Sequence, residues 1–419
     1  MNVTRDHIER LIIDRIILDT PEGIRVSNQT GSNQKSTIQT SPIQTSPAQT
    51  NPAKINRSLL ANNHNFLSLP QEELRLDERL PHSLLNPIAL RIKLIAERYT
   101  NLRESTITAL SEQECQAYAA YYLLINIEKI ARLLATQSQL TSSSGLRVLD
   151  YGCGPGTGGL ALALTCKNAF SLTAIDSNPG MRKVALKLIA DLKNWGSLTS
   201  YEILPLQTEP KGLFDLIIIG HVLNEMPVPE QEQLLLKLLS RLTSTGTLLI
   251  LESALPQQTR ELMAHRDFLL AHDTSLKIVF PCTHQAPCPM LKNSTTDWCH
   301  GSMNWKPPHL IRQLDQLTGF NKHAIKYSGL IFNRSSTPLS LEAREYRVVG
   351  PTEHNKTGHT LSICGSDFFG ATLLQKKSRR DENIELRRAE HFDLIAVEGN
   401  EPVASLFPES LIVSRVRAP

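Results

Sequence analysis

The chain has 419 residues, of which 41% are hydrophobic and 20% charged, and this composition excludes a wholly disordered or fibrous protein. Its 44 basic and 41 acidic side chains give a net charge of +3, which is too mild to indicate a nucleic-acid binder by charge alone, and DNA is not an expected partner. No apolar run approaches the roughly 18 residues of a membrane span. Acidic residues interrupt the apolar N-terminus, which argues against a signal or transit peptide. We expect a cytoplasmic protein without a membrane partner.

Two segments come first in the chain. Residues 1–26 include a short apolar-periodic stretch and predict one short N-terminal helix. Residues 27–56 contain imperfect QTSP repeats, several prolines and no acidic residue. A segment with so few large apolar residues buries little surface, so this composition predicts a disordered linker.

Residues 57–140 have a helical pattern. Apolar side chains recur on one helix face at Ile88, Ile92 and Ile95. Ser111 followed by Glu114 is a capping box that opens a second long helix. Three tyrosines on that helix are expected to pack in the core: Tyr118, Tyr121 and Tyr122.

Residues 141–334 alternate β-rich runs with helical patterns. The β-rich runs are LRVLDYG, SLTAID, LFDLIIIG and GTLLILE. Strands that alternate with helices of this length predict βαβ units and therefore an α/β domain with a Rossmann-like parallel sheet. Residues 335–419 contain shorter alternating segments and predict a small β-rich C-terminal domain.

A glycine-rich loop follows the first predicted strand. Asp150 closes that strand, and Gly152, Gly154 and Gly156 come directly after it. Glycines let the backbone approach a ligand closely, and the N-terminus of the helix that follows favours an anionic group. Asp176 closes the next strand, where an acid can hold the ribose of an adenosine-type cofactor. The loop alone would also fit a nicotinamide cofactor.

The acid-Tyr-Gly-Cys-Gly-Pro-Gly form of this loop resembles the first motif of class I S-adenosylmethionine methyltransferases, and so does FDLIIIGHVLNEMP at the fourth strand. The resemblance implies S-adenosylmethionine as cofactor, with Asp150 near its methionine amine and Asp176 on its ribose. It places His221 and Asn224 at the mouth where substrate enters. The Asn/Asp-Pro-Pro-aromatic turn of base-methylating enzymes is missing here. His221 is therefore either a general base or a residue that only lines the pocket.

Three of the seven cysteines crowd into one segment after the fifth strand, FPCTHQAPCPMLKNSTTDWCHGSMNW. An odd number of cysteines disfavours a disulfide framework, and thiolates at this density usually bind metal. The spacing of Cys282, Cys288 and Cys299 is not that of a zinc knuckle. The fourth ligand is left open among His284, His300 and Cys364. Irregular spacing suits an iron–sulfur cluster better than zinc, with zinc and metal-free buried thiols as alternatives.

The glycine loop together with LPHSLLNP, PCTHQAPCP and DWCH is similar to one family, the methyltransferase-like small-ribosomal-subunit assembly factors of mitochondria and their bacterial relatives. The resemblance implies a [4Fe–4S] cluster whose ligands are Cys282, Cys288, Cys299 and Cys364. It also implies a partner, the RNA of the small ribosomal subunit. The polar N-terminus points to a bacterial cytoplasm, with a mitochondrial location as the alternative.

Two functions remain open at this stage. The first is an S-adenosylmethionine-dependent methyltransferase that acts on ribosomal RNA or protein. The second is a non-catalytic assembly factor that uses the pocket and the cluster as structural supports. A zinc-containing methyltransferase with another substrate is a further alternative. A mixed-charge cluster in the C-terminal domain, including Lys376, Lys377, Arg379, Arg380, Arg387 and Arg388, fits RNA phosphates or an ordinary solvated loop about equally.

Overall fold

The structure is a computed structural model. It describes residues 3–18, 80–101, 110–334, 344–350, 353–354, 356, 358–375, 389–397 and 413–416. The predicted linker and the basic residues between 376 and 388 lie outside the described residues. Within the described residues, no helix combines the length and the apolar character that a membrane crossing needs.

An eight-stranded sheet organises the larger part of the chain, in the order β3-β2-β1-β4-β5-β8-β6, with β7 paired to β8. Its parallel strands are β1 (Arg147–Tyr151), β2 (Phe170–Asp176), β3 (Leu198–Pro205), β4 (Phe214–Gly220) and β5 (Leu242–Glu252). The remaining strands are β6 (Leu276–Phe280), β7 (Gly301–Asn304) and β8 (Ala324–Arg334). β8 lies antiparallel between β5 and β6. A dinucleotide-binding sheet has a sixth parallel strand beside the fifth, so this antiparallel insertion is a departure from that fold.

Helices cover both faces of this sheet. One face carries α5 (Glu112–Ala135), α7 (Thr157–Thr165) and α8 (Pro179–Asn194), and the other carries α9 (Val228–Leu239) and α10 (Pro256–His272). The strand residues alternate between these layers, because successive side chains of a strand point to opposite faces. On β4, for example, Leu216 and Ile218 join the first core, whereas Ile217 and Ile219 join the second. The predicted parallel α/β sheet is therefore confirmed.

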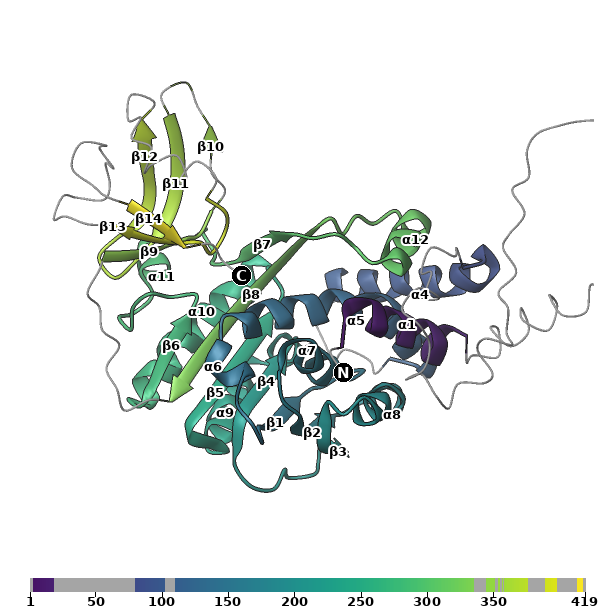
Figure 1. Cartoon of the computed structure of the whole chain (residues 1–419). Coiled ribbons are helices and arrows are strands. Elements are labelled where there is room, and N and C mark those ends of the chain that lie inside the picture. The colour runs from purple at the N-terminus through teal and green to yellow at the C-terminus, as the bar shows by residue number, and fades with distance from the viewer. Residues whose placement is uncertain are drawn as a thin grey trace, which may run out of the picture.

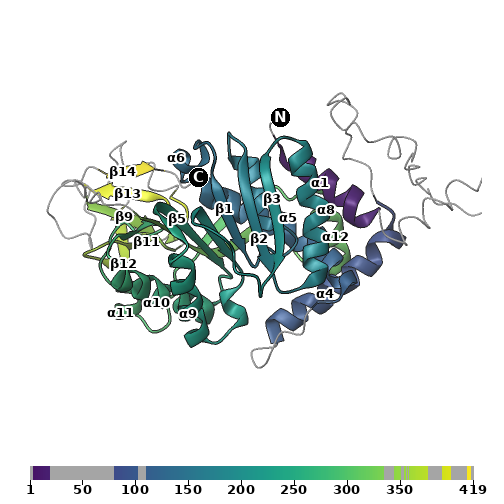
Figure 2. The ribbon, with the colours of Figure 1, turned by 90° about the horizontal axis from the view of Figure 1, so that it is seen from below.

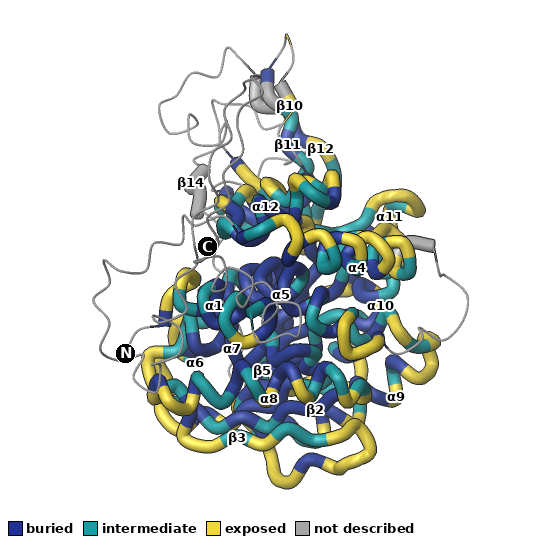
Figure 3. Tube along the Cα trace, turned by 90° about the vertical axis from the view of Figure 1, so that its right-hand side faces the viewer, coloured by how far each residue is buried: buried dark blue, intermediate teal, exposed yellow. Residues whose placement is uncertain are grey.

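The helices before the sheet gather at one end of it, together with a later helix (Figures 1 and 2). They are α1 (Arg5–Ile12), the π-helix η1 (Ile13–Ile17), α4 (His82–Asn101) and α12 (His309–Thr318). Ser111 and Glu114 form the predicted capping box at the start of α5. Figure 3 shows α5 in the buried interior of the molecule, where it packs against both the N-terminal helices and the sheet.

A smaller antiparallel sheet forms the C-terminal part, beside α11 and β7 (Figure 1). Its strands are β9 (Arg344–Val348), β10 (Glu353–His354), β11 (Gly358–Cys364), β12 (Phe369–Gln375), β13 (Leu394–Val397) and β14 (Val413–Val416). It has a separate core that includes Tyr346, Leu361 and Ile395. The β-rich C-terminal region predicted from the sequence is confirmed. Three short helices complete the described elements: α6 (Ser138–Thr141), η4 (Leu223–Glu225) and α11 (Pro289–Asn293).

Candidate functional site

The glycine loop crosses the carboxyl end of the parallel sheet. Gly152, Gly154 and Gly156 have positive φ angles of 71°, 53° and 94°, a region that other residues rarely adopt. Gly156 is the N-cap of α7, so the loop delivers the chain directly into that helix. The backbone N–H of Gly158 in its first turn donates to Asp150 Oδ2 at 2.9 Å. Asp150 therefore ties the end of β1 to the start of α7.

Asp176 holds the other side of the loop. Its carboxylate accepts hydrogen bonds of 2.8 Å from the backbone N–H of Gly154 and of 2.8 Å from that of Asn178. Burial raises the pKa of Asp176, and it raises the pKa of Asp150, which is fully enclosed, to about 7. These two carboxylates lie on neighbouring strands and shape one loop from both sides.

A cavity of about 550 Å³ opens above the loop, and we refer to it as the central cavity. Five of the residues predicted from sequence line it: Gly152, Gly154, Asp176, His221 and Asn224. Asp150 lines a smaller hollow that shares Gly152, Gly154 and His221 with the central cavity. Gly156 is not among the residues that line either hollow; its Cα faces Ile189 and Ala185 of α8.

Both a positive φ and close packing require glycine at position 152, whereas only a positive φ favours glycine at position 145. A Cβ on Gly152 would stand 2.2 Å from Val222 Cγ2, in addition to the strain of its positive φ. Gly145, with a φ of 67°, would meet nothing within 4 Å. We expect Gly152→Ala to lower the free energy of unfolding by about 2–5 kcal/mol, against about 1–2 kcal/mol for Gly145→Ala. Urea unfolding of both variants checks this, and equal losses would contradict the close packing of the loop.

Helix α5 contributes a row of cavity residues that the sequence analysis did not assign to a site. Tyr118, Tyr122, Asn126 and Lys129 line the cavity, and their spacing places them on one helix face. Tyr121 lies in the core as predicted, but Tyr118 and Tyr122 also form a wall of the cavity. One sequence feature could have indicated this face of α5: polar residues interrupt the apolar stretch LLINIEKIARLL. In the structure Asn126, Glu128 and Lys129 of this stretch are all buried.

The turn after β4 brings further ionisable groups to the cavity. His221 has a positive φ of 59°, and burial followed by the nearby Lys129 lowers its pKa well below the usual range. Burial, then the charge of Asp176, raises the pKa of Glu225 to about 7. Glu252 at the end of β5 accepts from the backbone N–H groups of Val222 and Leu223, yet burial raises its pKa to about 8. The buried carboxyl of Glu252 therefore holds the turn after β4 in place.

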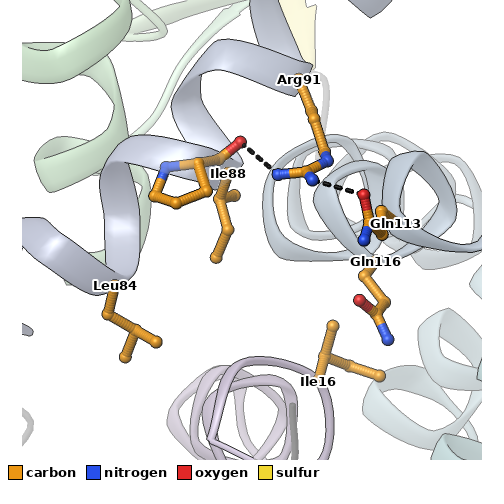
Figure 4. A pocket seen from close by; sticks show the side chains of 7 residues that line it. Ile16, Leu84, Ile88, Arg91, Gln113 and Gln116 are labelled. Carbon is orange, nitrogen blue, oxygen red and sulfur yellow. Dashed lines mark hydrogen bonds between the residues drawn. The ribbon is translucent and has the colours of Figure 1, made fainter. Parts of the chain in front are cut away.

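A separate hollow lies between η1, α4 and α5 (Figure 4). Its volume is about 30 Å³, close to that of a water molecule. Arg91 on its wall donates to the carbonyl of Pro87 at 3.0 Å and to Gln113 Oε1. This hollow is too small for a cofactor, so the central cavity is the candidate small-molecule site.

The four predicted cysteine ligands come from separate segments. Cys282 follows β6, Cys288 caps α11, Cys299 precedes β7, and Cys364 is the last residue of β11 in the smaller sheet. All four are free thiols. Burial, followed by the charges of Cys282, Cys364 and Cys288, raises the pKa of Cys299 well above its ordinary value. The fold therefore brings Cys364 into the neighbourhood of the other three.

One buried and one partly buried arginine stand beside this cysteine group. Arg266 of α10, with 1% of its surface exposed, donates from Nε to Cys282 Sγ at 3.2 Å and from Nη2 to the carbonyl of His284 at 2.8 Å. Arg347 of β9 donates to the carbonyls of Pro281 and Phe392, each at 2.7 Å. Neither arginine was singled out from the sequence, because only the folded chain shows how close they are to the thiols.

The two histidines considered as ligands have other surroundings. His300 stacks on Trp298, with ring centroids 5.3 Å apart, and contacts the carbonyl of Trp298. His284 is buried; burial and then Arg266 lower its pKa to about 4. Both ring nitrogens of His284 are buried without a hydrogen-bond partner among the described residues. Among the described residues, no group of three or more His, Cys, Asp and Glu side chains is arranged to hold a metal ion.

The sheet order, the glycine loop and the acids at the ends of β1 and β2 define a methyltransferase-like protein with a Rossmann-like fold. A protein-family model described as Rsm22, mitochondrial small ribosomal subunit Rsm22, matches residues 112–391. The chain belongs to the Rsm22 family. Comparison with curated protein sequences gives no match.

Several solved structures are similar over part of the chain. Magnesium protoporphyrin IX methyltransferase from Synechocystis PCC 6803, with bound SAM, is 14% identical; the match covers 60% of this chain and 97% of that one, with a TM-score of 0.33. The N-methyltransferase NodS from Bradyrhizobium japonicum WM9 is 18% identical, with coverages of 50% and 88% and a TM-score of 0.32. Ribosomal protein L11 methylase from Lactobacillus delbrueckii subsp. bulgaricus is 19% identical, with coverages of 50% and 78% and a TM-score of 0.28.

Proposed function

We propose that this protein binds S-adenosylmethionine in the central cavity and acts on, or assembles, the small ribosomal subunit, with a [4Fe–4S] cluster on Cys282, Cys288, Cys299 and Cys364. The observation that carries the proposal is the cavity itself, which lies above a glycine loop tied on both sides by Asp150 and Asp176. The ribosomal partner is supported by the family that the chain belongs to. A bacterial cytoplasm is the proposed location, although the family is described as mitochondrial.

The residues of the cavity suit this cofactor. A Cβ on Gly154 would meet only Thr157, at 4.0 Å, so the loop leaves its backbone open to a ligand. Asn224 Oδ1 is buried without a hydrogen-bond partner in the described part of the chain, and Asn224 lines the cavity. Asp176 would accept the ribose hydroxyls, while Asp150 would keep the loop in place and face the methionine amine. Tyrosine rings from α4 and α5 offer π-faces to a sulfonium cation.

When bound, S-adenosylmethionine supplies a methyl group that a nucleophile can attack directly. Methyl transfer of this kind needs mainly positioning, so a strong base is not required. His221 stays neutral at physiological pH because burial and Lys129 lower its pKa. A neutral imidazole can take a proton from the substrate atom that receives the methyl group. The role proposed for His221 is this proton acceptor at the cavity mouth.

The chemistry of the cysteine group suits an iron–sulfur cluster. Four thiols come together from separate segments: burial, followed by the nearby Cys282, raises the pKa of Cys299 and Cys364, and Met263 and Met290 share an apolar cluster with Cys288, Cys299 and Cys364. The thiolates of Cys282, Cys288, Cys299 and Cys364 would hold the cluster and would supply its iron with the four cysteine ligands typical of [4Fe–4S] centres. The two nearby arginines would offset the negative charge of four thiolates, and Arg266 would donate to one cluster ligand. Zinc is the alternative metal.

Asp150→Ala tests the cofactor site. We expect the variant to lose affinity for S-adenosylhomocysteine by about 100-fold, because the loop loses its tie to α7 and the amine loses its acceptor. Isothermal calorimetry measures this. Asp215→Ala is the matched control, since Asp215 pairs with Arg147 at the opposite, amino end of the neighbouring strand. Undiminished affinity in Asp150→Ala would contradict the assignment of the cofactor to the central cavity.

A non-catalytic assembly factor is the second candidate function. It is favoured by the turn after β4, where His221 and a short 3-10 helix replace the proline-rich turn of base-methylating enzymes. Incubation of immature small subunits with tritiated S-adenosylmethionine separates the two. Label transferred by the wild type but not by Asp150→Ala indicates an enzyme. Association with the subunits without transfer indicates an assembly factor.

A further inference from the structure

Lys129 is the one lysine or arginine among the described residues that line the central cavity. It projects from α5 with 8% of its surface exposed, and it makes no ion pair within the described chain. The other charged side chains of the cavity are acidic: Asp176 and Glu225. A buried, unpaired ammonium is costly, so its presence in a ligand cavity calls for a partner.

The surroundings of Lys129 hold its head group in place without neutralising it. Nζ donates to Asn126 Oδ1 at 2.9 Å, and Asn126 Nδ2 in turn donates to the Tyr118 hydroxyl at 3.1 Å. Nζ also stands 3.4 Å from His221 Nε2. More distant charges act on it from two other elements, Glu252 at the end of β5 and Lys322 before β8. An ammonium group has three donor hydrogens, and the bond to Asn126 uses one of them.

We propose that Lys129, held by Asn126 and positioned beside His221, is the receptor in the central cavity for an oxyanion of the bound molecule. Two sources have this chemistry: the carboxylate in the amino-acid tail of the cofactor, and a phosphate of a nucleic-acid acceptor. The carboxylate rests on the proposed function, since it requires S-adenosylmethionine in the cavity. Repulsion from Asp176, and from the ionised fraction of Glu225, directs an anionic group toward Lys129 and away from the rest of the cavity wall.

The test uses the full-length protein and its Lys129→Met variant, in which a side chain of similar length removes the charge and its N–H donors. Binding of two probes is measured by calorimetry: S-adenosylhomocysteine, which has the carboxylate, and methylthioadenosine, which lacks the whole amino-acid tail. Binding of inorganic phosphate in the presence of methylthioadenosine is followed by phosphorus NMR. Lys183→Met is the matched control, because Lys183 is an exposed lysine on α8 that pairs with Glu112.

We expect Lys129→Met to bind S-adenosylhomocysteine about 10- to 100-fold more weakly and methylthioadenosine within about threefold of the wild type, as loss of one charge-assisted hydrogen bond predicts. This result would show that Lys129 binds the carboxylate in the amino-acid tail of the cofactor. Unchanged affinity for S-adenosylhomocysteine, with phosphate binding lost only in Lys129→Met, supports the oxyanion site and assigns it to the acceptor.

The inference is overturned if Lys129→Met matches the wild type with all three probes. Lys129→Arg adds a further check, because it keeps the charge and should recover at least part of the lost affinity. If neither adenosyl probe binds the wild type, the proposed cofactor is wrong. The phosphate measurement would still decide the role of Lys129 in that case, so the two failures can be distinguished.

Discussion

Replacing Cys364 by serine is expected to remove most of the iron and acid-labile sulfide from protein purified without oxygen. The wild type should carry about four of each per chain, the stoichiometry of a [4Fe–4S] cluster, whereas the variant should fall below about one. The reason is geometric. Cys364 ends β11 in the smaller sheet, and the other three cysteines come from the segments around β6, α11 and β7, so its thiolate would be the ligand contributed by the C-terminal part.

The same substitution should also loosen the smaller sheet. Amide hydrogen exchange in β11 and in its partner strand β9 is expected to rise in Cys364→Ser, because a metal cluster that joins two parts of a fold contributes directly to stability. Cys166→Ser is the control, since Cys166 lies at the end of α7 among residues of the larger core. Unchanged iron would remove Cys364 from the ligand set, and one zinc without sulfide would replace the cluster by a zinc site.

The glycine loop shows what local sequence can predict. Asp150, the loop and the N-terminus of α7 are contiguous, so their contacts depend on a few neighbouring residues and on the strand-loop-helix order. Asp176 was also within reach, because parallel neighbouring strands end at the same edge of a sheet. Three residues that line the central cavity, Gly152, Gly154 and Asp176, therefore followed from pattern and spacing.

Lys129 and Arg266 could not be assigned to a site from local sequence. Each lies on a helix, and the sequence does not specify which side of α5 or α10 faces a cavity or a thiol until the tertiary packing is known. Lys129 was not singled out from the sequence, because its environment depends on β4 and β5, which come much later in the chain. Arg266 meets Cys282 only because α10 packs beside β6.

The antiparallel strand β8 and the position of Cys364 are long-range features of the same kind. β8 inserts between β5 and β6 after a return of the chain through α11, β7 and α12, and its own residues do not reveal that location. The spacing of the cysteines left the fourth ligand open among three residues. Only the family resemblance named Cys364, and the influence of Cys282 and Cys288 on its pKa is consistent with that choice.

Lys129→Met is expected to stabilise the protein at low pH, and by less as the pH rises. Burial lowers the pKa of Lys129 from an ordinary 10.5 to about 7, with Lys322 adding to the effect and Glu252 opposing it. Between these two values the unfolded chain holds a proton that the folded chain releases, so wild-type stability rises with pH across this window. Below about pH 7 both states are protonated, and the folded state bears the full cost of the buried charge.

We therefore expect the free energy of unfolding at pH 6 to be about 3–5 kcal/mol higher in Lys129→Met than in the wild type, since the interval between the two pKa values corresponds to at most about 5 kcal/mol. Urea unfolding from pH 6 to pH 9.5 should show this advantage shrinking steadily. Lys183→Met should give a small difference with little pH dependence, because the Lys183 side chain is 59% exposed. A variant less stable than the wild type at pH 6 would mean that the ammonium of Lys129 is solvated or paired in the folded protein, and that the cavity does not hold the unpaired cation on which its proposed affinity for an oxyanion depends.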